Sequence, residues 1–482
     1  MIHGPMATEL PGLDLLEAAA ALRGGETSPT ELLRATLARI ERFEPQLHAY
    51  VRVLADGAAR QAERAEAEIA RGEARGPLHG VPIAIKDLCA TKGVPTAAGT
   101  TVLADRRPDH DATVVEKLAD AGAVIIGKTM LTEGASGEHH PDLVEPVNPW
   151  SPGHWPGVSS SGSGVAVAAG LCFGALGSDT GGSIRFPSAA CGVTGLKPTY
   201  GRVSRYGVFP LAASLDHIGP MTRSAADAAA LLQGIAGHDP NDPTSLRQAL
   251  PDLAAELTRG IRGLRIGIDE TYCTEHTAPE VSEAVLAASR VLADLGADLA
   301  AVHVPPWQAL AAGWSAVCGV EAAMAHAETF PARADEYGPG LRRLLEHGLQ
   351  TSGADYAAVQ AESAAFRGRL AETFESVDVL LCPSMPMPAP PVEAMRQLRG
   401  GRPSPSEGGE DGAALAPLMK FTAPYDFSGS PTISLPCGFT GSGLPLSVQL
   451  VGRPLEEATL CRAGHAYQGA TDWHRRRPAL VS

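Results

Sequence analysis

Paired cysteines and long apolar runs are missing from this 482-residue chain. Its eight cysteines are scattered without a CxxC pair, so the sequence indicates neither a zinc ribbon nor a disulfide framework. We therefore expect reduced, mostly buried thiols. The longest apolar candidate, Val165 to Leu176, is interrupted by Gly170 and Gly174 and is shorter than the ~18 residues of a membrane helix. We expect no membrane partner.

Basic clusters are scarce as well. The chain has 39 Lys and Arg against 54 Asp and Glu, whereas binding of nucleic-acid phosphates needs clustered cations. We interpret the one basic cluster, Arg475 to Arg477, as a solvated tail. The N-terminus lacks a basic region and carries Asp14 and Glu17 in its apolar stretch, so it predicts no secretory signal. We expect a cytoplasmic monomer or homodimer that acts on a small molecule and binds no nucleic acid.

Helical and strand patterns alternate along the chain. A capping box at Ser28 to Glu31, with a proline at the first helical position, predicts a helix start. Strands are predicted at 81–85, 123–127, 264–268, 298–303, 377–381 and 446–451, and helices at 58–71, 114–121, 279–295, 307–330 and 355–374. This alternation is typical of a doubly wound α/β protein. The two longest helices predict a helical layer over the active face, and 402–412 predicts a mobile loop.

Glycine, serine and alanine dominate the stretch 157–190. Glycines let the backbone pass close to a ligand, and successive free N–H groups in such a turn form an anion-binding nest. If Ser183 attacks a carbonyl carbon, the N–H groups around it are the natural donors to the developing oxyanion. The predicted donors are Thr180, Gly181, Gly182 and Ser183.

A serine hydroxyl needs a base before it attacks. No histidine lies near Ser183 in the sequence, and the GxSxG and SxxK motifs are absent around it, although 15 histidines leave a folded-in one open. A lysine can serve if burial leaves its amine neutral, and Lys86 ends an apolar strand that favours such burial. The segment 138–140, Glu-His-His, has no further ligands at suitable spacing, so we interpret it as a pocket rim or loop surface and expect no metal.

Several motifs resemble the amidase signature family. They are GVPIAIKD at 80–87, the Ser/Gly run at Ser159, GSDTGGSIR at 177–185 and GLKPT at 195–199, and similarity continues at 214–220, 378–383 and 431–436. The resemblance implies an α/β fold with a large central mixed sheet covered by helices on both faces. It also implies a single domain over residues 1–482, with a signature core at about 75–225 and a helical, lid-like substrate side at about 305–415.

The resemblance further implies a Ser-cis-Ser-Lys triad without a cofactor. The family's spacing of 24 residues between relay and nucleophile puts the relay at Ser159, with Ser183 as nucleophile and Lys86 as base. Neutral Lys86 would take a proton from Ser159, which takes one from Ser183, and the peptide bond before Ser159 would be cis. We expect support from Ser160, Asp179 and Arg185, the last two as an ion pair that holds the nucleophile loop.

Departures from the family pattern concern the substrate. Many members have two glycines before the relay serine and Ser-Ser-Gly-Gly-Ser from it onward, whereas this chain has Gly157-Val158 and then Ser-Ser-Ser-Gly-Ser. Met130 and Leu131 replace polar residues common in the family, which indicates an apolar substrate. The predicted substrate contacts are Met130, Leu131, Gly157 and Val158. The variant with Val158 and Ser161 also resembles a branch that handles synthetic aryl amides and urethanes.

Three functions remain open at this point. The first is a free-standing hydrolase of amides, aryl amides, carbamates or esters. The second is the glutaminase subunit of a tRNA-dependent amidotransferase, which the segments 201–207 and 237–240 also resemble. That subunit holds the glutamine amino group with an acidic residue three positions before a threonine, and aligned on Thr422 this chain has Met419 there. The third is an inactive binding homologue, which retention of the three predicted catalytic residues disfavours.

Overall fold

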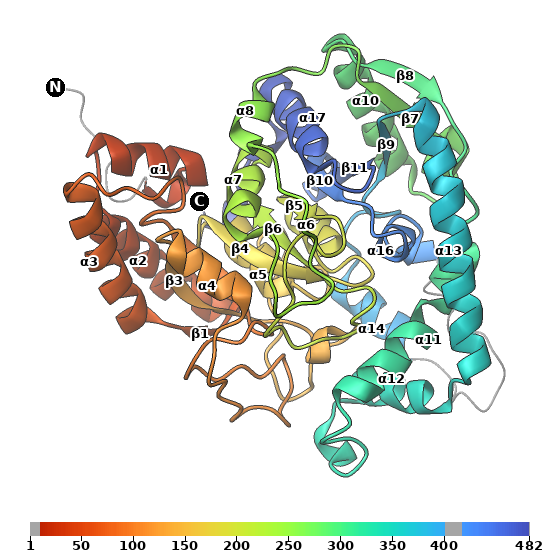
Figure 1. The fold of residues 1–482 in the computed structure, drawn as a ribbon, viewed down its shortest axis with the longest axis horizontal. Helices are drawn as coiled ribbons and strands as arrows, with labels where there is room; N and C mark the ends of the chain where they lie inside the picture. Colours follow the sequence, from red (N-terminus) through yellow and green to blue (C-terminus); the bar gives the residue numbers. More distant parts are fainter. Residues whose placement is uncertain (1–9, 401–416, 482) are drawn as a thin grey trace.

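The computed structural model describes residues 10–400 and 417–481, and its eleven strands form one sheet (Figure 1). The strand order is β1-β3-β2-β4-β6-β5-β10-β11-β9-β7-β8. The bounds are β1 Tyr50–Val53, β2 Pro82–Lys86, β3 Val124–Thr129, β4 Gly174–Asp179, β5 Thr194–Lys197, β6 His217–Thr222, β7 Arg265–Ile268, β8 Asp298–Ala301, β9 Val379–Pro383, β10 Thr432–Phe439 and β11 Pro445–Gly452. The sheet is mixed, because β2 is parallel to β3 and β4 whereas β6 is antiparallel to β4 and β5.

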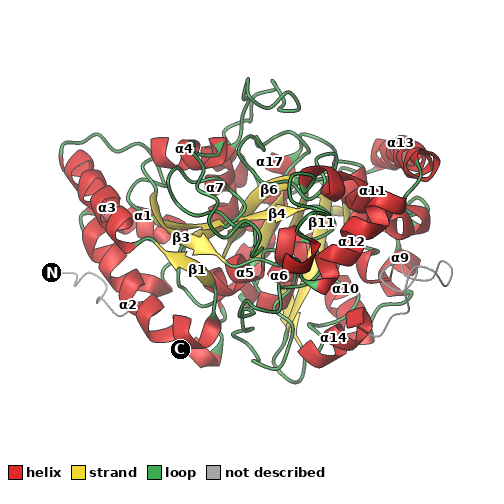
Figure 2. Ribbon diagram, turned by 90° about the horizontal axis from the view of Figure 1, so that it is seen from below, coloured by secondary structure: helices red, strands yellow, loops and turns green. Residues whose placement is uncertain are grey.

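Helices surround this sheet on both faces (Figure 2). Their bounds are α1 Leu15–Gly24, α2 Pro29–Leu47, α3 Ala55–Ala70, α4 Thr113–Asp120, α5 Ser161–Ala168, α6 Arg185–Cys191, α7 Ala225–Ile235, α8 Leu253–Leu257, α9 Glu270–Thr274, α10 Pro279–Asp294, α11 Gln308–Ala325, α12 Pro339–Gln350, α13 Gly353–Ser376, α14 Val392–Gly400, α16 Ala423–Phe427 and α17 Glu457–Ala470.

Strand β10 shows how the two faces are covered. Ile433 packs against Gly464 of α17. The next residue, Ser434, pairs with Gly195 of β5, which packs against Ser188 of α6. Because successive strand residues face opposite sides, α17 and α6 lie on opposite faces of the sheet. The expected α/β fold, with a large mixed sheet between helical layers, is confirmed.

Most of the predicted elements are present with shifted ends. The capping box is formed, since the Glu31 N–H donates to the Ser28 hydroxyl and the Ser28 N–H donates to the Glu31 carboxylate. The strands predicted at 298–303 and 377–381 become β8 and β9, and the helix predicted at 307–330 ends at Ala325. Helix α12 fills the gap before α13 and was not predicted. The predicted loop 402–412 lies outside the described residues.

Two expectations about composition can also be compared with the structure. All eight cysteines are free and buried, so the thiol prediction is confirmed. Among the helices of residues 10–400 and 417–481, none combines the length and the apolar character that a membrane crossing requires.

Candidate active site

The carboxyl ends of two neighbouring strands define the site. Lys86 is the last residue of β2 and Asp179 the last residue of β4, and these strands are parallel. Parallel strands end at the same edge of a sheet, which is where α/β proteins bind ligands. The chain thus brings the lysine of the first motif beside the Gly-rich turn that follows β4.

The Lys86 amine lies among three serine hydroxyls. Its Nζ is 2.6 Å from Ser159 Oγ, 2.8 Å from Ser160 Oγ and 2.7 Å from Ser178 Oγ. The Ser160 hydroxyl donates its proton to the Ser178 carbonyl, so it can only accept a hydrogen bond from the amine. A neutral amine has two N–H groups and one lone pair. Its lone pair is therefore available to the hydroxyl proton of Ser159 or Ser178.

Burial favours the neutral amine. The Lys86 side chain is fully buried. Burial lowers the pKa of Lys86 to about 7, although the negative charges of Asp179 and Asp216 oppose this shift. Near neutral pH a substantial fraction of Lys86 is therefore a free base, the protonation state that a general base needs.

Backbone contacts bring the segments that carry Ser159 and Ser183 together. The peptide bond between Val158 and Ser159 is cis, as the resemblance implied. The Ser160 N–H donates to the Ser183 carbonyl at 3.3 Å, and the Thr132 N–H donates to the Ser159 carbonyl at 3.3 Å. Ser159 is fully buried, whereas Ser183 keeps 7% of its surface exposed. Of the two serines, Ser183 is thus the one that a molecule from solvent can reach.

An ion-pair network holds the turn that carries Ser183. Arg185 binds the Asp179 carboxylate with two nitrogens, at 2.8 and 3.0 Å, and binds Asp426 at 2.7 Å. Asp179 also accepts the N–H of Gly182 at 2.6 Å and of Ile184 at 2.9 Å. The expected ion pair between Asp179 and Arg185 is present and fully buried.

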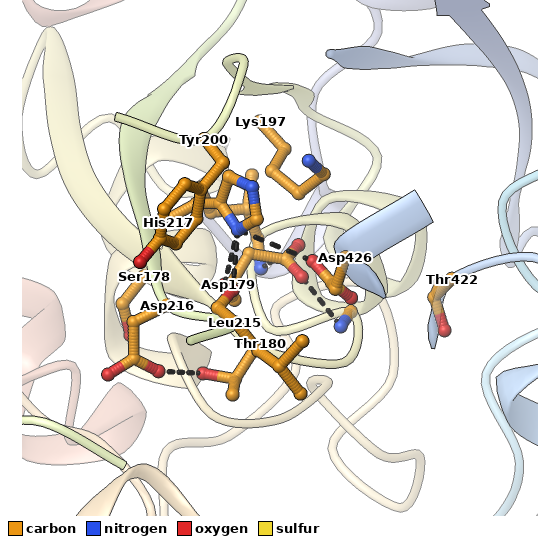
Figure 3. Close-up of polar contacts among 12 residues, drawn as sticks. Ser178, Asp179, Thr180, Lys197, Tyr200, Leu215, Asp216, His217, Thr422 and Asp426 are labelled. Atoms are coloured by element: carbon orange, nitrogen blue, oxygen red, sulfur yellow. Dashed lines mark hydrogen bonds and ion pairs between the residues drawn. The ribbon is translucent and has the colours of Figure 1, made fainter. Parts of the chain in front are cut away.

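The pKa values of the two carboxyl groups in this network are shifted in opposite directions. Burial alone would raise the pKa of Asp179, but the Arg185 guanidinium and the backbone N–H of Ile184 hold it well below its usual range. Burial and the neighbouring charge of Asp179 raise the pKa of Asp426 well above its usual range, against the opposing effect of Arg185. Figure 3 shows both side chains beside Thr180 and His217. Asp179 is therefore the carboxylate that keeps its charge and fixes the turn.

One of the four predicted oxyanion donors already has a partner within the protein. The Gly182 N–H already donates to Asp179, which removes Gly182 from the set of free donors. Among the described residues, no group accepts a hydrogen bond from the N–H of Thr180, Gly181 or Ser183. The Thr180 hydroxyl donates its proton to Asp216 at 2.6 Å (Figure 3), and its backbone N–H stays a predicted donor.

The predicted substrate contacts fall into two groups. Leu131 is fully buried within the main apolar core, so its side chain is not free to meet a substrate and that prediction requires correction. Met130 is 7% exposed and uses its backbone to bind Ala49 and Gly162. Gly157, at φ 91°, packs directly against Pro187. Substrate contact by Met130 and Gly157 stays a prediction.

Val158 belongs to an apolar cluster beside the nucleophile turn. The buried members of this apolar cluster are Trp155, Val158, Phe186, Ala189, Ala311, Met385, Met395, Leu418, Met419 and Ala423. The position that a Cβ of residue 181 would occupy lies 2.7 Å from Met419 Cε and 2.6 Å from Trp314 Nε1. The surroundings of Gly181 are therefore apolar, apart from one indole N–H.

The residues 138–140 have protein partners. Glu138 binds Arg343, His139 lies 3.0 Å from the Ser161 hydroxyl, and His140 contacts the Glu336 carbonyl. His139 thus reaches the first turn of α5, next to the relay serine. Within residues 10–400 and 417–481, no group of three or more His, Cys, Asp or Glu side chains has a metal-binding arrangement.

Sequence reasoning missed four residues of this site: Ser178, Asp216, Trp314 and Asp426. Ser178 lies within a recognised motif, and its position one residue before the strand-ending Asp179 was a usable signal. Asp426 is 241 residues from Arg185, and no local pattern marks such a partner.

The chain also matches known proteins along most of its length. The family model described as Amidase matches residues 31–461. The protein AmiD of Mycobacterium tuberculosis, named as an amidase, is 49% identical over 471 residues, which are 97% of this chain and 96% of AmiD. The A-type subunit of glutamyl-tRNA(Gln) amidotransferase from Chloroflexus aurantiacus is 41% identical and is covered completely, with 98% of this chain.

A solved structure gives the same result for the fold. The structure of 6-aminohexanoate cyclic dimer hydrolase superposes with a TM-score of 0.88 at 30% identity, covering 98% of this chain and 99% of that chain. Its strands and helices therefore correspond to those described above nearly throughout. The sequence motifs, the site and these matches agree, and this chain belongs to the amidase family, as a hydrolase of carbon–nitrogen bonds.

Proposed function

We propose that the protein hydrolyses the acyl carbon–nitrogen bond of a small, fairly apolar amide, aryl amide or carbamate through an acyl-enzyme on Ser183. The observation that carries the proposal is the buried Lys86 amine, whose pKa is lowered to about 7 by burial and which contacts the Ser159 hydroxyl at 2.6 Å. A buried amine with hydroxyl partners is suited to proton transfer at neutral pH. Esters are included as possible substrates because they share the acyl carbon.

The proposed reaction uses the triad in two steps. Lys86 accepts the proton of Ser159, and Ser159 accepts the proton of Ser183 as Ser183 Oγ bonds to the acyl carbon. The N–H groups of Gly181 and Ser183 stabilise the oxyanion, each donor being worth about 3 kcal/mol in such sites. The proton then passes to the leaving nitrogen, the carbon–nitrogen bond breaks, and water hydrolyses the acyl-enzyme by the reverse proton path.

The apolar surroundings of Gly181 support the substrate class. Met419 Cε lies against Gly181, where a carboxylate would be needed to hold the amino group of glutamine. Val158 and Phe186 extend the same apolar cluster. A neutral, apolar acyl or aryl group fits such a wall better than a zwitterion does, because no charge has to be desolvated without a partner.

The remaining assignments follow from the same proposal. The signature core at about 75–225 would supply the chemistry, and the helical region from about 305 would cover the substrate, since α11 contacts Thr180. Residues 401–416 of that region lie outside the described residues. We place the enzyme in the cytoplasm, without a cofactor, and acting as a monomer or homodimer.

The glutaminase role remains the second candidate because the amidotransferase relative is 41% identical. The two are distinguished with a p-nitroanilide, an aryl carbamate, an aryl ester and glutamine, comparing the wild type with Ser183→Ala. Hydrolysis of an apolar substrate, lost in the variant and with glutamine untouched, is the expected result. Turnover of glutamine alone would refute the proposal in favour of the amidotransferase role.

The apolar wall has its own test. Met419→Asp is expected to lower kcat/KM for the apolar substrate about tenfold or more, because a buried unpaired carboxylate opposes an apolar group. Met324→Asp is the matched control. Met324 lies on α11 and is 73% exposed, so this substitution makes the same change of charge at the surface. Equal effects of the two substitutions would contradict the role of Met419. Failure of a fluorophosphonate probe to label Ser183 would favour the inactive homologue.

A further inference from the structure

Thr180, the first residue of the nucleophile turn, is held from two directions by side chains that the triad mechanism does not use. The indole Nε1 of Trp314, on α11, donates to the Thr180 carbonyl at 2.8 Å. The Thr180 hydroxyl donates to Asp216 at 2.6 Å, as the dashed line in Figure 3 marks. Trp314 lies 134 residues from Thr180 in the sequence, and both of its contacts with the turn are local to residues 180 and 181.

We propose that Trp314 and Asp216 are positioning residues of the acyl-transfer reaction, which fix the direction of the Gly181 N–H in the oxyanion hole. This inference rests on the proposed function. The Thr180 carbonyl and the Gly181 N–H belong to one planar peptide group, so their directions are coupled. A hydrogen bond that fixes the carbonyl on one side therefore fixes the N–H on the other. It also polarises the peptide, which strengthens the N–H as a donor.

The next peptide of the turn is fixed independently. The Gly182 N–H, which belongs to the peptide after Gly181, donates to Asp179 at 2.6 Å. Two successive peptide planes are thus locked by Trp314 on one side of Gly181 and by Asp179 on the other. Such a turn needs no rearrangement when the oxyanion forms, which is the condition under which a donor contributes most to the rate.

Asp216 is itself held rigidly. Its carboxylate accepts the N–H of Leu211 at 3.0 Å and of Ala212 at 3.2 Å, and the residue is only 6% exposed. The carboxylate therefore cannot follow Thr180 if the turn moves. A fixed acceptor restricts the rotation of the Thr180 side chain and, through it, the backbone of the first turn residue.

Trp314 and Asp216 are also connected to each other. Glu321, two turns after Trp314 on α11, accepts the N–H of Ser214 at 2.8 Å, two residues before Asp216. The same carboxylate accepts the hydroxyl of Tyr356 on α13. The helix that carries Trp314 and the loop that carries Asp216 are therefore joined by hydrogen bonds. The two side chains that hold Thr180 are thus fixed relative to each other.

Gly181 makes the contact with the indole possible. A Cβ at residue 181 would lie 2.6 Å from Trp314 Nε1, closer than real Cβ atoms approach other atoms. The indole therefore packs against the residue whose N–H it orients. Trp314→Phe keeps an aromatic ring but removes the N–H donor and part of the indole volume, so its control must lose the same volume elsewhere on the helix.

The test measures the rate at which a fluorophosphonate phosphonylates Ser183, because this reaction uses the oxyanion hole and needs no known substrate. Trp314→Phe is expected to slow labelling about tenfold or more, in the range seen when an oxyanion donor is misplaced. Trp307→Phe, at the N-terminal end of the same helix but in contact with Tyr272, is the matched control. Thr180→Val should slow labelling as well, and Thr180→Ser, which keeps the hydroxyl, should recover most of the rate. Thermal unfolding confirms that each variant is folded.

The outcomes separate this inference from the proposed function. Wild type that is not labelled at Ser183 refutes the proposed function and the inference with it. Wild type that is labelled, with Trp314→Phe labelled equally fast, overturns the inference alone. With an active substrate, a fall in kcat at constant KM supports the positioning role, whereas a rise in KM alone overturns it and assigns the indole to the substrate wall.

Discussion

The rate of acyl transfer should follow the titration of Lys86. Burial lowers its pKa to about 7, and only the neutral amine can accept the proton of Ser159. A group with this pKa is about one tenth neutral at pH 6, half neutral at pH 7 and about nine tenths neutral at pH 8. Activity is therefore present above the pKa and is lost as the pH falls through it. We expect kcat/KM to rise about tenfold from pH 6 to 8 and then to level off.

The assay follows kcat/KM for a neutral p-nitroanilide between pH 5 and 10 at constant ionic strength, since such a substrate does not titrate in that range. Glu133→Gln is the control, because burial raises the pKa of Glu133 to about 7 as well. Glu133 accepts the N–H of Gly338 and does not contact the triad. A rate that is flat between pH 6 and 10, or a profile that disappears in Glu133→Gln, would refute the role of Lys86.

Two further predictions concern the scaffold of the site. Arg185→Met leaves the buried Asp179 carboxylate without its cation and should lower the free energy of unfolding by about 3–5 kcal/mol, whereas Arg265→Met, which breaks a partly exposed pair, should cost less than about 1 kcal/mol. Equal denaturation midpoints for Arg185→Met and Arg265→Met would contradict this difference in stability. Gly157→Ala should abolish activity and destabilise the fold, because residue 157 has φ 91° and its Cβ would lie 2.3 Å from Pro187 Cα. A fully active Gly157→Ala variant would show that the turn can relax.

Local sequence patterns predicted the elements whose apolar residues are the ones that become buried. The apolar run of β2 is fully buried, and the strand ends at Lys86 as expected. Strand β4, with the sequence GALGSD, was not predicted because it contains no β-branched or aromatic residue. Its neighbours β2 and β6 supply the hydrogen bonds and the burial that make it a strand. Tertiary context, rather than propensity, determines this segment.

The site shows the same division between features that local sequence reveals and features that depend on tertiary contacts. The three proposed catalytic residues and the proposed donors around Ser183 came from motifs and from the general nest argument, and they stay predictions. The nest argument did not anticipate that Asp179, three residues earlier, accepts the Gly182 N–H. The partners Trp314 and Asp426 were inaccessible, since they reach the turn from segments more than 130 residues away. Long-range contacts of single side chains leave no periodic signal in the sequence.

The proposed mechanism requires one buried basic group, Lys86, to lose its charge and another, Arg185, to keep it. Lys86 has only hydroxyl partners, so desolvation dominates, whereas Arg185 binds two carboxylates and stays charged. The charge of Asp179 opposes the lowering of the Lys86 pKa, and Arg185 is the cation that binds this carboxylate. In a folded Arg185→Gln variant, the midpoint of the pH–rate profile should therefore move above about 7. A folded variant with an unchanged midpoint would show that Arg185 does not control the base.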